Sequence, residues 1–294
     1  MSILVTTPNG QIGRRLSNAI LDAGVPLTII SRRAETSQEL TRRGARLIEG
    51  AVEDASTLER ATEGVDTIFW LTPPNAIPGF LDWAREIAAR AAEIAKKNGV
   101  QRAIVLSSIG AQHPAGTGPI VAVHRAEIEF AKRFEHQRNL RTAYFMENYR
   151  RDLPTIAAAG RLYSAMSPDH PFPTVATADI ADVAARVALD QAFEGQANVG
   201  IHGPRDLSLR EQVAELSLGL GRAIELVSVG IDAARAGMRQ AGMPDFLVDL
   251  YSELIEGANR GLVAADEPRS AATTTPTELR DFAARVLRPE LEAL

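Results

Sequence analysis

The sequence predicts an α/β protein built on a doubly wound parallel sheet, with a smaller mixed region toward the C-terminus. Short apolar runs alternate with helical patterns from residue 3 to residue 108, as in parallel sheets with right-handed crossovers. The run Thr67–Leu71 is almost entirely apolar, which is typical of a strand covered on both faces. The stretch Ser2–Leu16 reads as a strand, a glycine turn and a helix, which is how such a sheet begins.

In the first half of the chain, turn and capping residues separate the strands from the helices. Gly24 and the pair Asn98-Gly99 are helix C-terminal signals, and Asp54 or Ser56 is suited to cap the helix that begins there. The expected strands are residues 3–6, 26–31, 46–49, 67–71 and 102–106, and the expected helices are residues 11–23, 35–43, 54 onward, 79–98 and 121–136.

The second half mixes helices with short strands. Ser208 and Glu211 have the spacing of a capping box and predict a helix over residues 206–220. We expect residues 1–150 to form the dinucleotide-binding domain and residues 151–294 to form a smaller α/β substrate-binding region, intertwined with the first. The other expected elements are a loop at 112–119, strands at 141–145 and 225–229, and helices at 231–241, 244–260 and 276–290.

Composition excludes several classes of protein. The chain has 294 residues, of which 45% are hydrophobic and 23% charged, so one or two soluble globular domains are expected. A net charge of −5 argues against nucleic acid as a partner. There is no cysteine, no apolar run of membrane-spanning length and no N-terminal signal-peptide pattern. We therefore expect a cytoplasmic protein, monomeric or homodimeric, with a small-molecule substrate and no membrane contact.

The glycine turn is the strongest candidate for a ligand site. Backbone N–H groups and the positive end of a helix converge there, and glycine lets the chain approach a ligand closely. The matching ligand is a dinucleotide pyrophosphate on a Rossmann-type fold. A strand-to-helix turn without a ligand is the alternative. The candidate cofactor-binding residues in this turn are Thr7, Asn9, Gly10, Gln11 and Ile12.

The end of the second strand indicates which dinucleotide is bound. An acidic residue there would hold the ribose 2′-OH of NAD, whereas an arginine would accept the 2′-phosphate of NADP. The chain has Ser31, Arg32 and Arg33 at this place and no acid. A guanidinium matches a phosphate well, so we predict NADP(H) as the cofactor. The alternative is that the arginines belong to a solvated loop.

Further candidates follow the fourth and fifth strands, because open α/β sheets bind ligands at the carboxyl ends of their strands. Thr72, Pro73 and Asn75 are expected to border the cofactor. Ser107 is a candidate cofactor residue and Ser108 a candidate catalytic residue, although either serine could instead cap a turn. No cluster of His, Asp and Glu has metal-ligand spacing, so no metal is expected.

Several segments carry a resemblance to the NmrA-like family of atypical short-chain dehydrogenases/reductases. The chain is similar in particular to quinone and triphenylmethane reductases and to ergot-alkaloid imine reductases. Thr7 stands where the family's glycine motif usually has its first glycine. The matching segments are Thr7 with Gly10 and Gly13, Trp70–Pro74, Val123–Glu127, Phe145–Asn148 and Asp179–Ala184.

The chain departs from ordinary short-chain dehydrogenases in its acid–base residues, because those enzymes pair a Tyr with a Lys four positions later. Here the residues four positions after the four tyrosines are Asn148, Leu153, Ser167 and Ile255. A ketone that accepts hydride needs a positioned proton donor far more than a quinone or an iminium does. The sequence therefore favours electrophiles that need little more than hydride.

Four residues complete the predicted site. His124 lies on the helix that the resemblance places at the active site, where it would donate a proton or bind the nicotinamide ribose. The alternative for His124 is a structural or solvated side chain. Phe145, Glu147 and Asn148 are expected to line the substrate pocket, although Glu147 and Asn148 could instead cap the sixth strand.

These residues predict an NADP(H)-dependent oxidoreductase that transfers a hydride to a small apolar electrophile such as a quinone or an imine. The cofactor would carry the chemistry, and the protein would supply position and a dry pocket. The alternative is a non-catalytic NADP(H)-binding redox sensor of the NmrA type. Both the missing first glycine and the missing Tyr–Lys pair are compatible with that alternative.

Overall fold

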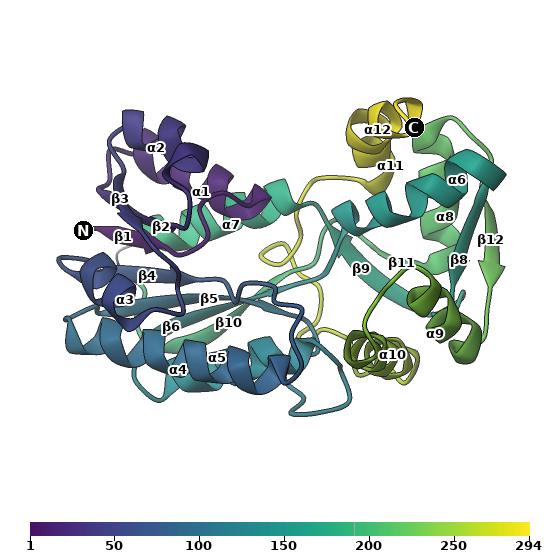
Figure 1. The fold of residues 1–294 in the computed structure, drawn as a ribbon. Coiled ribbons are helices and arrows are strands. Elements are labelled where there is room, and N and C mark those ends of the chain that lie inside the picture. Colours follow the sequence, from purple (N-terminus) through teal and green to yellow (C-terminus); the bar gives the residue numbers. More distant parts are fainter. Residues whose placement is uncertain (191) are drawn as a thin grey trace. The chain divides into compact units, whose positions relative to one another are not determined.

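The computed structural model describes residues 1–190 and 192–294 and confirms the predicted α/β fold (Figure 1). Its main sheet has seven strands in the order β10-β6-β5-β4-β1-β2-β3. β1 pairs in parallel with β2 and β4, β2 with β3, and β4 with β5. The strands are β1 (Ile3–Val5), β2 (Leu27–Ser31), β3 (Arg46–Glu49), β4 (Thr67–Trp70), β5 (Arg102–Ser108), β6 (His136–Thr142) and β10 (Gln196–Ile201).

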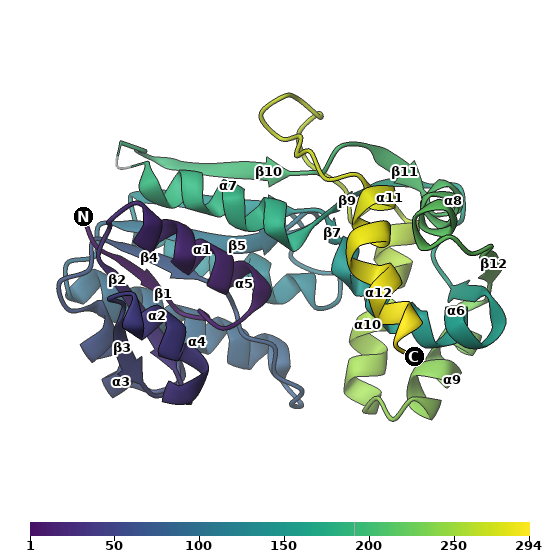
Figure 2. The same ribbon diagram turned by 90° about the horizontal axis from the view of Figure 1, so that it is seen from above.

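Helices cover both faces of this sheet (Figures 1 and 2). α1 and α7 lie side by side on one face, where Arg15 Nε donates to Asp182 Oδ1 at 2.6 Å. α4 and α5 lie on the other face, where Trp70 and Phe130 are fully buried. Burial on both faces explains why the strands read as apolar runs. The helices are α1 (Gln11–Asp22), α2 (Gln38–Arg42), α3 (Ala55–Thr62), α4 (Phe80–Lys97), α5 (Ile120–Ala131) and α7 (Thr177–Leu189), with a short η1 (Ala34–Ser37).

The chain divides into two compact units, each built from three segments. The expected domains, 1–150 and 151–294, cut the chain once and do not coincide with these units. Unit 1 comprises Met1–Ser108, Ala122–Arg141 and Ile180–Val199, and unit 2 comprises Ile109–Val121, Thr142–Asp179 and Gly200–Leu294.

Unit 2 contains two small sheets, with strand orders β11-β9-β7 and β12-β8. Its core gathers Met146, Leu216 and Leu287, all fully buried. The strands are β7 (Tyr144–Phe145), β8 (Arg161–Ser164), β9 (Pro171–Val175), β11 (Asp206–Ser208) and β12 (Glu225–Ser228). The helices are η2 (Met146–Asp152), α6 (Leu153–Ala159), α8 (Leu209–Leu220), α9 (Ile231–Gln240), α10 (Asp245–Asn259), α11 (Leu279–Phe282), η3 (Ala283–Leu287) and α12 (Arg288–Glu292).

The predicted capping box at α8 is confirmed. Ser208 Oγ accepts from the Glu211 N–H at 3.3 Å, and the Ser208 N–H donates to Glu211 Oε2 at 2.8 Å. Asp54 occupies the N-cap position of α3, but its side chain makes no capping hydrogen bond. The predicted end of α4 is also confirmed, because Gly99 has a φ of +85°.

Several predicted boundaries are wrong, among them the start of the helix predicted over residues 206–220, which begins at Leu209 after the short strand β11. The helix predicted over residues 121–136 ends at Ala131, and the sixth strand begins at His136 rather than at residue 141. The strand start is polar and has no apolar pattern, but Gln137 is fully buried and donates to Glu127 O at 3.0 Å. The C-terminal helix begins at Leu279 rather than at residue 276. Thr277 is held by Asp179, which accepts from its N–H at 3.0 Å and from its hydroxyl at 2.8 Å.

Candidate functional site

The turn between β1 and α1 has the backbone geometry of an anion site. α1 begins directly after Gly10, and no acidic residue lies in its first turn. The first N–H groups of a helix have no partner within the helix and attract negative charge. Gly13 packs α1 onto the turn, because a Cβ there would lie 1.9 Å from Thr7 O, whereas a Cβ at Gly10 would lie 3.9 Å from that atom. Gly13 is therefore needed for packing, and Gly10 leaves space for a ligand.

The residues of this turn fit a dinucleotide pyrophosphate. Thr7 Oγ1 is buried and has no hydrogen-bond partner among the described residues. A buried hydroxyl without a partner costs free energy, and a phosphate oxygen would satisfy it. Gln11 and Ile12 form the start of α1, and the Ile12 side chain is buried, so Ile12 can offer a ligand only its backbone.

A hydrogen-bond network joins the turn to the loop after β2. Asn9 Nδ2 donates to Ser31 Oγ at 3.0 Å and to Thr36 Oγ1 at 2.8 Å. Ser37 Oγ donates to Asn9 Oδ1 at 3.1 Å. Asn9 and Ser31, both predicted to bind the cofactor, thus bind one another. Sequence patterns did not reveal this, because it depends on residues more than twenty positions apart.

The two arginines after β2 are exposed. Within the part of the chain that the structure describes, neither the Arg32 nor the Arg33 guanidinium has a hydrogen bond or an ion pair. No carboxylate among the described residues therefore competes for them, and a guanidinium is well matched to a phosphate group.

The remaining cofactor candidates lie at the ends of two neighbouring strands of the same sheet. Thr72 follows β4 and accepts from Trp70 Nε1 at 3.1 Å, and Pro73 and Asn75, both half-buried, come next. Ser107, buried, and Ser108, half-buried, are the last residues of β5. β5, β4, β1 and β2 are neighbours in the sheet and parallel, so their carboxyl ends share one edge. The sheet thus gathers the predicted cofactor residues at this edge, where the strand order reverses.

His124 and Ser108 both belong to unit 1. The His124 side chain is half-buried on α5. Ion pairs fix this helix: Arg125 Nη1 lies 2.7 Å from Asp82 Oδ1 of α4, and Arg141 Nη2 of β6 lies 2.8 Å from Glu127 Oε2.

The predicted substrate residues belong to unit 2. Phe145 pairs with Val175 in the sheet. The Glu147 carboxylate accepts from the Thr177 N–H at 3.0 Å and from the Thr177 hydroxyl at 2.5 Å, so it caps the start of α7. Asn148 forms a side-chain hydrogen bond with Tyr144 that lowers the pKa of that phenol, but burial, the largest influence, raises it. Glu147 therefore already has a structural role.

A group of titratable side chains near these residues was not anticipated from the sequence. The guanidinium of Arg151 donates to the Tyr144 hydroxyl and lies over the Tyr144 ring. Burial raises the pKa of Tyr144 to about 12. Burial also raises the pKa of Asp152 to about 6, although the charge of Arg151 opposes the shift. The Tyr149 hydroxyl donates to Gln212 Oε1 at 2.5 Å. Burial thus raises the pKa values of Tyr144 and Tyr149 above that of an ordinary phenol and raises the pKa of Asp152 to about 6.

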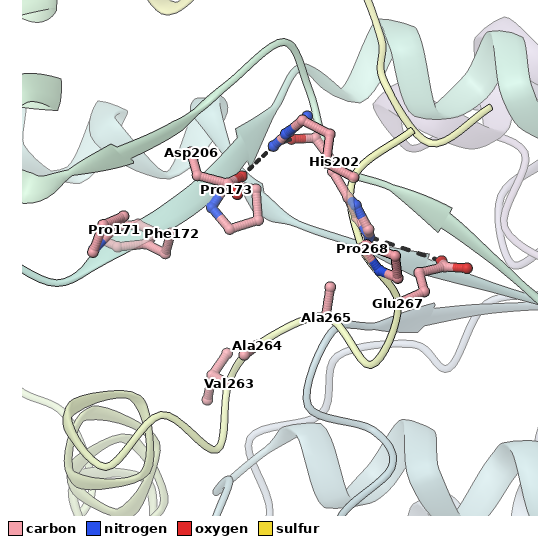
Figure 3. A pocket seen from close by; sticks show the side chains of 11 residues that line it. Pro171, Phe172, Pro173, His202, Asp206, Val263, Ala264, Ala265, Glu267 and Pro268 are labelled. Atoms are coloured by element: carbon pink, nitrogen blue, oxygen red, sulfur yellow. Dashed lines mark hydrogen bonds and ion pairs between the residues drawn. The ribbon is translucent and has the colours of Figure 1, made fainter. Parts of the chain in front are cut away.

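Unit 2 also contains a cavity of about 220 Å³ (Figure 3). His202 is almost fully buried beside it, and burial lowers the pKa of His202. His202 Nε2 lies 3.9 Å from Glu267 Oε1, and Arg269 forms an ion pair with Asp206. None of the predicted site residues lines the cavity. Its lining residues are Pro171, Phe172, Pro173, His202, Asp206, Val263, Ala264, Ala265, Glu267, Pro268 and Arg269.

No group of three or more His, Asp or Glu side chains in residues 1–190 and 192–294 is arranged to hold a metal ion. Across the same residues, no helix is both long enough and apolar enough to cross a membrane.

Comparison with known proteins places this geometry in a family. A family model described as NAD(P)H-binding matches residues 8–148, which include Asn9, Gly10 and the arginine loop. This match confirms the predicted nicotinamide cofactor at the level of NAD(P)H. The match also includes His124 and the ends of β4 and β5.

Two curated relatives and one solved structure are similar over most of the chain. A (4-alkanoyl-5-oxo-2,5-dihydrofuran-3-yl)methyl phosphate reductase of Streptomyces griseus is 33% identical, with 90% of each chain covered. An NAD(P)H azoreductase of Xenophilus azovorans is 29% identical, covering 86% of this chain and 85% of the relative. An NADPH-dependent quinone oxidoreductase of Escherichia coli, solved with NADPH, has the same fold, with a TM-score of 0.82 at 22% identity over 97% of this chain and 99% of the other.

Proposed function

Because the chain belongs to the NAD(P)H-binding, NmrA-like family of atypical short-chain dehydrogenases/reductases, we propose that it is an NADP(H)-dependent reductase of small apolar electrophiles such as quinones or imines. The pair Arg32 and Arg33 carries the cofactor choice. Both guanidinia are exposed, and neither pairs with a carboxylate among the described residues. The names of the two relatives suggest azo compounds and furanone phosphates as further substrates to test.

Each part of the site contributes one function to this reaction. The start of α1 and the buried Thr7 hydroxyl hold the pyrophosphate, and the arginine pair holds the 2′-phosphate. When bound, the nicotinamide supplies the hydride. The substrate also takes up one proton, and His124 is the side chain that we assign to donate it or to orient the ribose. The chain has no Tyr–Lys pair, so ordinary ketones should be poor substrates.

The test begins with the cofactor. Fluorescence titration should show NADPH binding at least about tenfold more tightly than NADH, which corresponds to roughly 1.4 kcal/mol. Arg32→Ala should weaken NADPH binding and leave NADH binding nearly unchanged. Equal affinity for the two dinucleotides in the wild-type protein would contradict the proposed cofactor.

The second step is a screen of quinones, cyclic imines, azo dyes, furanone phosphates and ketones for loss of the reduced-nicotinamide absorbance. Turnover of the first three classes and little turnover of ketones is the expected result. A redox sensor is the second candidate, because Thr7 stands in place of a first glycine and the Tyr–Lys pair is absent. Tight NADPH binding without turnover of any electrophile would favour the sensor.

A further inference from the structure

Asn9 uses both of its side-chain donor hydrogens inside the protein. A carboxamide has two such hydrogens, and here one reaches Ser31 Oγ at 3.0 Å and the other reaches Thr36 Oγ1 at 2.8 Å. Its carbonyl oxygen accepts from Ser37 Oγ at 3.1 Å. The side chain therefore has no donor left for a ligand in the glycine turn.

The hydroxyls that Asn9 contacts hold the backbone of Arg33. Ser31 Oγ accepts from the Arg33 N–H at 3.3 Å and donates to Arg33 O at 2.9 Å. Thr36 Oγ1 donates to the same carbonyl at 2.8 Å. Ser31 and Ser37 are buried, so water competes weakly for these bonds. The network therefore holds the backbone of Arg33, one of the two residues with an exposed guanidinium.

We propose, on the basis of the NADP(H) function proposed above, that Asn9 is a positioning residue that sets the preference for a dinucleotide with a 2′-phosphate. An arginine loses much conformational freedom when it is held against a phosphate, and a fixed backbone reduces that loss. NADH has a hydroxyl in place of the 2′-phosphate, so its interaction with the two arginines is weak. Loss of the network should therefore weaken NADPH binding far more than NADH binding.

The experiment compares dissociation constants of NADPH and NADH for the wild type, Asn9→Ala and Thr36→Val. Adenosine 2′,5′-bisphosphate and 5′-AMP serve as a second pair of probes that lack the nicotinamide half. We expect Asn9→Ala to reduce the NADPH preference about tenfold, or roughly 1.4 kcal/mol. Thr36→Val should change the preference in the same direction by a smaller factor, because the bond between Asn9 and Ser31 survives.

Thr41→Val is the matched control. Thr41 is half-buried like Thr36, and its hydroxyl also donates to the carbonyl three residues earlier, Gln38 O at 3.0 Å, but it is not bonded to Asn9. This variant should keep the wild-type preference. If Asn9→Ala does not fold, the test is the comparison of the NADPH preference of Thr36→Val with that of Thr41→Val.

Two results would overturn the inference in distinguishable ways. If Asn9→Ala weakens NADPH and NADH by the same factor, Asn9 acts only on the turn, and the inference fails while the proposed function stands. If the wild-type protein binds neither dinucleotide, the proposed function fails and the inference falls with it.

Discussion

The Glu147 carboxylate lies at the start of α7 and accepts hydrogen bonds from both the N–H and the hydroxyl of Thr177, at 3.0 and 2.5 Å. A carboxylate at a helix N-terminus stabilises the helix through these bonds and through the helix dipole. Glu147→Ala should therefore lower the free energy of unfolding by about 1–2 kcal/mol, measured by urea denaturation.

Glu147→Gln separates this stabilising role from the predicted contact with substrate. The amide keeps one acceptor oxygen and loses the charge, so the loss of stability should be smaller than for Glu147→Ala. A large rise in KM with unchanged stability in Glu147→Gln would instead favour the substrate-binding role.

The two glycines of the turn should respond differently to substitution. Gly10→Ala meets no close atom, since the added Cβ lies 3.9 Å from Thr7 O. That variant should fold normally and lose affinity for NADPH, because the Cβ enters the space left for the pyrophosphate. Gly13→Ala would bring a Cβ to 1.9 Å from the same backbone oxygen, so it should lower the melting temperature as well. Full NADPH affinity in a folded Gly10→Ala protein would place the pyrophosphate elsewhere.

Asp152 should make the stability of the protein depend on pH. Its pKa is raised from 3.8 to about 6 by burial, so the native state binds a proton that the unfolded state has lost. Stability therefore falls as the pH rises from about 4 to about 6 and stays lowered above that. At 1.36 kcal/mol per pH unit, the shift corresponds to at most about 3 kcal/mol. Asp152→Asn should raise the free energy of unfolding at pH 7.5 and leave it nearly unchanged at pH 4. Equal effects at both pH values would exclude this assignment.

His124→Ala should lower kcat with NADPH and a quinone about 10²-fold, the low end for loss of a general acid. The thermal midpoint should stay close to that of the wild type, because the side chain is only half-buried. Tyr144→Phe, Tyr163→Phe and Tyr251→Phe are the comparison variants. Retained activity in His124→Ala, with activity lost in one tyrosine variant, would transfer the role to that tyrosine.

The sequence predicted the elements whose causes are local. The apolar run Thr67–Leu71 correctly predicted the strand β4. The spacing of Ser208 and Glu211 correctly predicted the capping box of α8. The start of β6 was missed because Gln137 is polar, and its burial depends on tertiary contacts such as its bond to Glu127 O, ten residues away. The sequence pattern was enough to predict whether a segment is a helix or a strand. The residues at which each element begins and ends depended on tertiary contacts.

The candidate site likewise has residues that the sequence could predict and contacts that it could not. Ser31, Arg32 and Arg33 were recognisable because their place after a strand has a meaning in this class of sheet. The link from Asn9 to Thr36 and the burial of Asp152 were not recognisable, since both arise from neighbours that only the folded chain supplies. A polar residue in a turn gives no local sign of which hydroxyl it will meet.

The division of the chain into alternating segments has a consequence for its synthesis. Unit 1 takes its last segment, Ile180–Val199, after two segments of unit 2 have already been made. β10, an edge strand of the main sheet, begins at Gln196. The glycine turn is synthesised long before β10, so the main sheet cannot be completed until most of these residues have been made. A fragment that ends at Ser108 would leave the outer edge of β5 unpaired and open to aggregation, so limited truncation from the C-terminus is a poor route to an isolated cofactor-binding unit.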